Sequence, residues 1–144
     1  MSNKLNARIL IADDQESARK ALKALIESCL GWDVCGQAEN GHQAIEKARE
    51  LRPDLIVLDL SMPKMDGLTA ARAIAEATPG IPVLIYTLYV TPELAVEAKK
   101  AGVRLIVDKA GTREKLLTSM TTLLTSSGFS TGDREDRQQL AGGL

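Results

Sequence analysis

Short apolar runs alternate with amphipathic segments along most of this 144-residue chain. After each run, apolar residues recur every three or four positions, which is the spacing of one face of a helix. The pattern therefore predicts five strands, each followed by a helix. The predicted strands cover residues 7–12, 33–39, 54–59, 81–87 and 103–108.

Strands that are apolar on both faces favour a parallel sheet that is covered by helices on both sides. One helix between consecutive strands supplies the right-handed crossover that parallel neighbours need. Thr91 and Pro92 are residue types typical of a helix N-cap and first helical position, and Gly102 is predicted to be the C-cap of that helix. The predicted fold class is therefore α/β, with a doubly wound parallel sheet.

A single domain is expected over residues 1–125. From Ser126 onward the sequence "SSGFSTGDREDRQQLAGGL" is polar and rich in glycine. Its few apolar residues cannot offset the conformational entropy that is lost on ordering. Residues 126–144 are therefore predicted to form a flexible tail, which is too short to fold into a helix-turn-helix module.

The charge balance, the absence of long apolar stretches and the two cysteines argue against some classes of function and indicate a cellular location. Eighteen Lys and Arg residues balance nineteen Asp and Glu residues without a long block of either sign, so direct nucleic-acid binding is not expected. No apolar stretch reaches the length of a signal peptide or a membrane span, so no membrane association is expected. Cys29 and Cys35 lack metal-ligand spacing and are predicted to stay reduced, which favours a cytoplasmic location.

Polar residues follow the carboxyl ends of four predicted strands. Asp13 and Asp14 come after the first strand, Asp59 ends the third, Thr87 ends the fourth and Lys109 follows the fifth. In an open parallel sheet these ends lie along one edge, where ligands bind. We therefore expect these five side chains to converge on one crevice.

Three carboxylates in one crevice would repel one another, and a divalent cation would relieve that repulsion. Oxygen ligands without cysteine or paired histidines favour a hard cation, and a few carboxylates suit magnesium better than calcium. A carboxylate beside a cation and a lysine can attack a phosphoryl group, because both positive charges neutralise the transferred oxygens. Asp59 is therefore predicted to form an aspartyl phosphate.

Four motifs resemble the receiver domains of two-component response regulators. They are "ILIADDQ", "DLIVLDLSMPKMDG", "VLIYT" and "VDKAG", and the similarity covers Arg8 to about Leu124. Each motif alone is weak evidence, whereas four in the right order on the right strands are strong evidence. The resemblance implies a flavodoxin-like, three-layer sandwich with a five-stranded sheet in the order 2-1-3-4-5. The first and second motifs look most like receivers that precede a helix-turn-helix DNA-binding domain.

The resemblance also implies a role for each site residue. Asp59 would be the phosphoacceptor, and Asp14 and Asp59 would be direct magnesium ligands. Asp13 would act on the metal largely through water, and the main-chain carbonyl of Ser61 would complete the protein's share of the coordination. Lys109 would hold one phosphoryl oxygen, while the Thr87 hydroxyl would swing toward another.

Several positions depart from the family pattern. The family usually has an aromatic residue three positions before the lysine, but this chain has Ile106. After the switch threonine the family prefers a small residue, whereas Leu88 and then Tyr89 follow it here. Both side chains are large enough to crowd the phosphate pocket, so slower hydrolysis of the aspartyl phosphate is expected.

The function that the resemblance implies is a signalling switch. Its phosphodonor would be a histidine kinase or phosphotransfer protein, and phosphorylation would change affinity for a downstream protein or a missing output domain, or cause homodimerisation. The chain would catalyse its own magnesium-dependent phosphoryl transfer and its own dephosphorylation without being a conventional turnover enzyme. Lys99, Lys100 and Arg104 are candidate partner contacts, because the family uses the surface of its fourth helix and fifth strand for output.

Three other functions remain open. A degenerate receiver that only docks partners, independently of phosphorylation, is favoured by Ile106 and Leu88. A phosphatase of the haloacid dehalogenase type also attacks with a strand-end aspartate, but it needs a D-x-D motif, and Ser61 occupies the second acidic position. A nucleotide-binding module would need a glycine-rich phosphate cradle after the first strand, where this chain has "ADDQES".

Overall fold

The computed structural model describes residues 6–60 and 67–126 of the chain. Strands and helices alternate without exception along this part of the chain. The elements are β1 (Ala7–Ala12), α1 (Glu16–Glu27), β2 (Trp32–Ala38), α2 (Gly41–Leu51), β3 (Leu55–Leu58), α3 (Gly67–Ala77), β4 (Val83–Thr87), α4 (Pro92–Lys100), β5 (Leu105–Asp108) and α5 (Arg113–Ser126).

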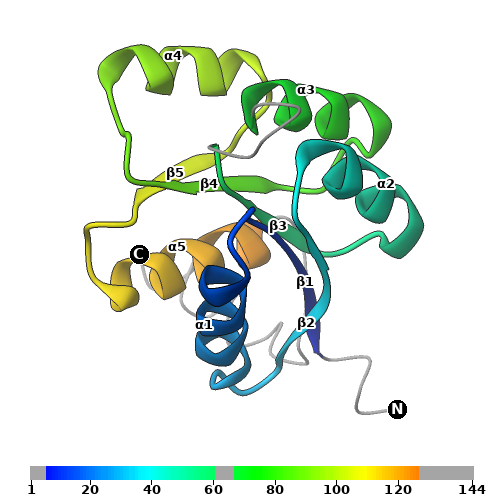
Figure 1. Ribbon diagram of the computed structural model, residues 1–144, viewed down its shortest axis with the longest axis vertical. Coiled ribbons are helices and arrows are strands. Elements are labelled where there is room, and N and C mark those ends of the chain that lie inside the picture. The colour runs from blue at the N-terminus through cyan, green and yellow to red at the C-terminus, as the bar shows by residue number, and fades with distance from the viewer. Residues whose placement is uncertain (1–5, 61–66, 127–144) are drawn as a thin grey trace, which may run out of the picture.

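All paired strands are parallel, and the sheet has the order β2-β1-β3-β4-β5. Helices α2, α3 and α4 cover one face of this sheet, and α1 and α5 cover the other (Figure 1). The α/β class, the strand order and the three-layer arrangement predicted from the sequence are therefore confirmed. None of the helices in the described ranges combines the length and apolar content that crossing a membrane requires.

The side chains of the central strands fill two separate hydrophobic clusters. Alternate residues of β3 point to opposite faces: Ile56 and Leu58 pack under α2, α3 and α4, while Leu55 and Val57 pack under α1 and α5. All four residues of β3 are buried, which explains why its sequence is continuously apolar. Burial on both faces holds the end of β3 rigidly, and Asp59 is the next residue.

Several predicted boundaries differ from the observed ones by one or two residues. Strand β5 begins at Leu105 instead of residue 103, because its pairing with β4 starts at Leu84. Helix α4 does begin at Pro92, with the Thr91 side chain accepting a hydrogen bond from the Leu94 N–H at 3.0 Å. Its C-cap is Ala101 and not Gly102, which follows with a φ of +95°.

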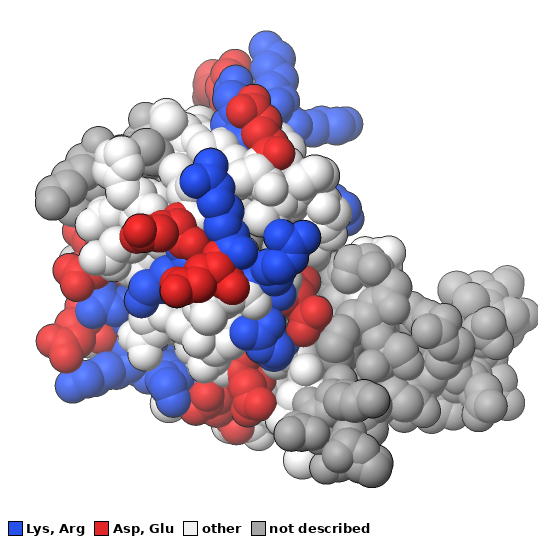
Figure 2. All heavy atoms as spheres, turned by 90° about the vertical axis from the view of Figure 1, so that its right-hand side faces the viewer, with Lys and Arg blue, Asp and Glu red and all other residues white. Residues whose placement is uncertain are grey.

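The predicted boundary at residue 125 falls inside helix α5, which extends to Ser126. The remainder of the predicted tail, residues 127–144, lies outside the described residues. Acidic and basic side chains are interspersed on the face of the molecule that carries α2 and the β2 edge (Figure 2). No broad field of one sign therefore covers that face.

Candidate functional site

Two backbone hydrogen bonds extend the parallel ladder beyond the ends of β1 and β3. The Asp59 N–H donates to the Ala12 carbonyl at 2.9 Å, and the Asp13 N–H donates to the Ala38 carbonyl at 3.0 Å. These bonds bring Asp13 and Asp59 to the same edge of the sheet with little backbone freedom. The convergence expected from parallel strands is thus produced by main-chain pairing as well as by side-chain packing.

The carboxylates of Asp13, Asp14 and Asp59 form a compact acidic group. Each contributes an oxygen, and these oxygens lie within 4.8 Å of one another. Asp13 is 5% exposed and Asp59 is 6% exposed, whereas Asp14 is open to solvent. Carboxylate oxygens at this spacing, with one side accessible to water, fit a hard divalent cation that retains some of its water ligands.

Lys109 places its ammonium against two of these carboxylates. Its Nζ lies 3.0 Å from Asp13 Oδ2 and 4.0 Å from Asp59 Oδ2. The Lys109 N–H donates to the Thr87 carbonyl at 2.8 Å, which fixes the backbone of the residue after β5. Three carboxylates and one ammonium leave a formal charge of −2, which one divalent cation would neutralise.

The acidic group opens into a cavity of about 220 Å³. Its lining residues are Asp13, Asp14, Gln15, Asp59, Leu88, Tyr89 and Lys109. Leu88 and Tyr89 are 59% and 67% exposed, so they form the rim of the cavity rather than its floor. This volume is large enough for several water molecules or a phosphoryl group next to Asp59.

Thr87 does not line this cavity, although the sequence analysis placed it among the converging residues. It is fully buried at the end of β4, and its hydroxyl accepts a hydrogen bond from the Tyr89 N–H at 3.2 Å. The hydroxyl is therefore engaged by the loop that follows its own strand. A turn of this side chain away from its own loop would break that hydrogen bond.

The other predicted site residues lie in different places. Ser61 lies outside the described residues. Ile106 is half-buried and packs on the side of the sheet that carries α4. Lys99 and Arg104, both exposed, line a second cavity of about 630 Å³ between α4 and β5, while Lys100 forms an exposed ion pair with Glu97 at 3.7 Å.

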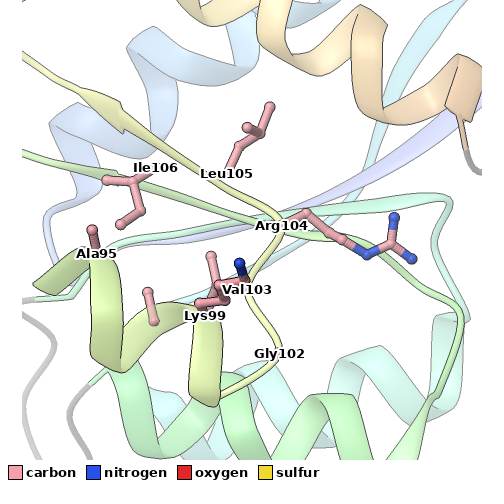
Figure 3. Close-up of a pocket in the computed structure, with 8 residues that line it drawn as sticks. Ala95, Lys99, Gly102, Val103, Arg104, Leu105 and Ile106 are labelled. Carbon is pink, nitrogen blue, oxygen red and sulfur yellow. The ribbon is translucent and has the colours of Figure 1, made fainter.

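Figure 3 shows how the second cavity is built. Ile106 extends toward α4 near Ala95, whereas Leu105 points to the opposite side of β5. The apolar part of the cavity wall therefore consists of small and aliphatic side chains, at the place where the family usually has an aromatic ring. The cavity is separate from the acidic crevice, since the two share no lining residue.

Reading the sequence missed three contacts that shape the crevice. Arg19 donates from its guanidinium to the Asp13 carbonyl at 2.7 Å, and Tyr86 lies under the Lys109 ammonium, 5.7 Å from ring centroid to Nζ. Gly67 lies so close to the end of β3 that a Cβ there would be 2.8 Å from the Asp59 carbonyl oxygen. Only the Tyr86 contact had a usable signal, because Tyr86 precedes Thr87 on the strand next to β5.

The family profile for the response regulator receiver domain matches residues 9–138. This chain belongs to the response regulator receiver family. Its relatives include the chemotaxis protein CheY of Thermotoga maritima, which is 35% identical over 100 residues, 69% of this chain and 82% of CheY. The transcriptional regulatory protein YdfI of Bacillus subtilis is 38% identical over 113 residues, 78% of this chain and 53% of YdfI.

Solved structures of receivers have the same fold. A response regulator of the LuxR family from Aurantimonas superposes with a TM-score of 0.81 at 30% identity, covering 84% of this chain and 86% of the other. The response regulator domain of Thermotoga maritima CheB gives 0.78 at 27% identity, covering 83% and 97%. Several longer relatives are matched only in part: this receiver spans 21% of a protein-glutamate methylesterase from Alkalilimnicola ehrlichii.

Proposed function

We propose that this receiver is a phosphorylation-activated switch that accepts a phosphoryl group onto Asp59 from a histidine kinase or a phosphotransfer protein. The observation that carries the proposal is the joint placement of three carboxylates and the Lys109 ammonium around one open cavity. An Asp59 oxygen would form the new O–P bond while the bond from phosphorus to the donor breaks. The donor, as leaving group, keeps the bonding electrons.

Magnesium is the cofactor we propose, with Asp14 and Asp59 as direct ligands and Asp13 acting through water. The Ser61 main-chain carbonyl is proposed as a further ligand. When bound, magnesium would neutralise charge on the transferred phosphoryl oxygens. Lys109 would hold one of those oxygens, because its ammonium already lies 4.0 Å from Asp59 Oδ2.

We propose that the Thr87 hydroxyl acts as a switch by contacting the phosphoryl group on Asp59. It now accepts the Tyr89 N–H, so a turn toward the phosphoryl oxygen would release that N–H and loosen the loop between β4 and α4. Phosphorylation would then favour a second loop arrangement by population shift. Catalysis would be limited to the chain's own phosphoryl transfer and dephosphorylation.

The output of the switch is proposed to pass through the surface of α4 and β5. Lys99, Lys100 and Arg104 are exposed there and would contact a downstream protein or an output domain. The match to only about half of a transcriptional regulator supports an output domain, and homodimerisation on phosphorylation is part of the proposal. The receiver domain is proposed to span residues 1–125, and its last helix, α5, continues to Ser126. Unpaired Cys29 and Cys35 support a cytoplasmic location.

Acetyl phosphate tests the proposal directly. Wild-type protein incubated with acetyl phosphate and magnesium should gain the mass of one phosphoryl group in intact-mass spectrometry, because Asp59 lines a cavity that a small donor can enter. Asp59→Asn should gain none, and omission of magnesium should strongly reduce the gain in the wild type. An equal mass gain in Asp59→Asn would place the acceptor elsewhere and reject the assignment.

Leu88 is proposed to prolong the lifetime of the aspartyl phosphate. Its side chain is on the cavity rim, where attacking water must pass. Leu88→Ala should therefore speed the loss of phosphate by about threefold to tenfold, measured by intact mass after removal of acetyl phosphate, since each tenfold change needs only about 1.4 kcal/mol. Val96→Ala, on the exposed face of α4, is the matched control. Equal lifetimes in Leu88→Ala and wild type would exclude a gating role.

The alternative is a degenerate receiver that docks partners without phosphorylation. It is favoured by the Thr87 hydroxyl, which is already hydrogen-bonded, and by the missing aromatic side chain at Ile106. Under this alternative, beryllofluoride with magnesium would leave the amide NMR signals of α4 and β5 unchanged. Under the main proposal the chemical shifts of those amide signals should change.

A further inference from the structure

We propose that Tyr86 is a positioning residue that keeps the Lys109 ammonium beside the phosphoacceptor; this inference rests on the function proposed above. The Lys109 Nζ lies 5.7 Å from the centroid of the Tyr86 ring, within the range of a cation–π interaction. The two residues come from the ends of neighbouring strands, β4 and β5 (Figure 1).

The backbone register accounts for this contact. Tyr86 is paired with Val107, and Val107 and Lys109 point to the same side because they are two residues apart. Val107 is buried in the hydrophobic cluster under α1 and α5, and the half-buried Tyr86 packs against that cluster. The Tyr86 ring therefore lies on the side of the sheet opposite to Ile106.

The Tyr86 ring attracts the Lys109 ammonium in a different way from the carboxylates of Asp13 and Asp59. Asp13 and Asp59 attract the ammonium through carboxylates that are also the proposed metal ligands. Carboxylates that hold a cation attract the ammonium less, because their charge is then shared. The Tyr86 ring has no ligand atom in the acidic group, so its attraction for Lys109 persists in the metal-loaded state.

The position of Lys109 also favours a supporting partner. Its side chain is 23% exposed, so water can compete for the ammonium once the carboxylates release it. A lysine side chain loses rotamer entropy when it is held in one conformation, and it would regain that entropy by leaving the crevice. Tyr86 opposes that departure and keeps Nζ within reach of a phosphoryl oxygen on Asp59.

The test compares Tyr86→Phe, which keeps the aromatic face, with Tyr86→Leu, which removes it. In wild type and Tyr86→Phe, the Lys109 ε-CH₂ protons should be shifted upfield by the ring, with and without magnesium. In Tyr86→Leu that shift should vanish. The rate of phosphorylation by acetyl phosphate at saturating magnesium should fall about threefold to tenfold in Tyr86→Leu and stay within about twofold of wild type in Tyr86→Phe.

Magnesium affinity, measured by calorimetry, should not fall in either variant, which separates positioning of the lysine from damage to the metal site. If Tyr86→Leu proves unfolded by circular dichroism, Tyr86→Met supplies a non-aromatic side chain of larger volume for the same comparison. Wild-type phosphorylation in the non-aromatic variant, or no ring-dependent shift of the Lys109 protons, overturns the inference. If wild type itself takes up no phosphate, the proposed function fails, while the NMR shift still decides whether Tyr86 holds the lysine.

Discussion

Lys109→Ala should bind magnesium about tenfold more tightly than wild type and yet accept phosphate about a hundredfold more slowly. The two effects have opposite signs because the ammonium repels a cation among the carboxylates but attracts the oxygens of a phosphoryl group. In the structure Nζ lies 3.0 Å from one carboxylate oxygen and 4.0 Å from another, so its removal takes one positive charge away from the group of three carboxylates.

Calorimetric titration with magnesium and intact-mass kinetics with acetyl phosphate measure the two effects separately. Lys20→Ala is a suitable control, since Lys20 is an exposed cation that pairs with Glu16 at 3.5 Å on α1. It should leave both quantities unchanged. A Lys109→Ala protein whose magnesium affinity falls would mean that the lysine supports the acidic group instead of competing with a cation.

Gly67→Ala should lower the free energy of unfolding by about 1–3 kcal/mol, a cost typical of an overpacked site. A Cβ at Gly67 would lie 2.6 Å from the Leu60 Cα and 2.8 Å from the Asp59 carbonyl oxygen. Both are backbone atoms, so a change of side-chain rotamer cannot relieve the overlap. The Gly67 N–H also donates to the Leu60 carbonyl at 3.2 Å. Relief of the overlap must therefore displace the backbone of Asp59 and Leu60.

Urea unfolding, monitored by circular dichroism, measures this loss, and phosphorylation kinetics should show a parallel decrease. Gly111→Ala is the matched control, because its φ lies outside the left-handed region and its nearest contact would be 3.3 Å. It should change stability by less than about 1 kcal/mol. Equal free energies of unfolding for Gly67→Ala and Gly111→Ala would show that the backbone of Asp59 and Leu60 can shift without loss of stability.

The sequence alone determined the fold class, the strand order implied by its family and the edge of the sheet on which the acidic group and Lys109 lie. Hydrophobic periodicity is a local property, and a residue that ends a buried strand must lie at the rim of a parallel sheet. Asp13, Asp59 and Lys109 could therefore be placed before any coordinates were known. Element boundaries were less accurate, because the ladder between β4 and β5 depends on a partner strand and not on local composition.

The tertiary structure alone decided how those residues contact one another. The partners of Lys109 are Asp13, Asp59 and the Tyr86 ring, which come from three different strand ends. The Thr87 hydroxyl turns to its own loop because the Tyr89 N–H lies within reach, a contact that depends on the path of the chain after β4. Distances of a few ångströms between residues remote in sequence follow from register and packing, which one-dimensional patterns do not encode.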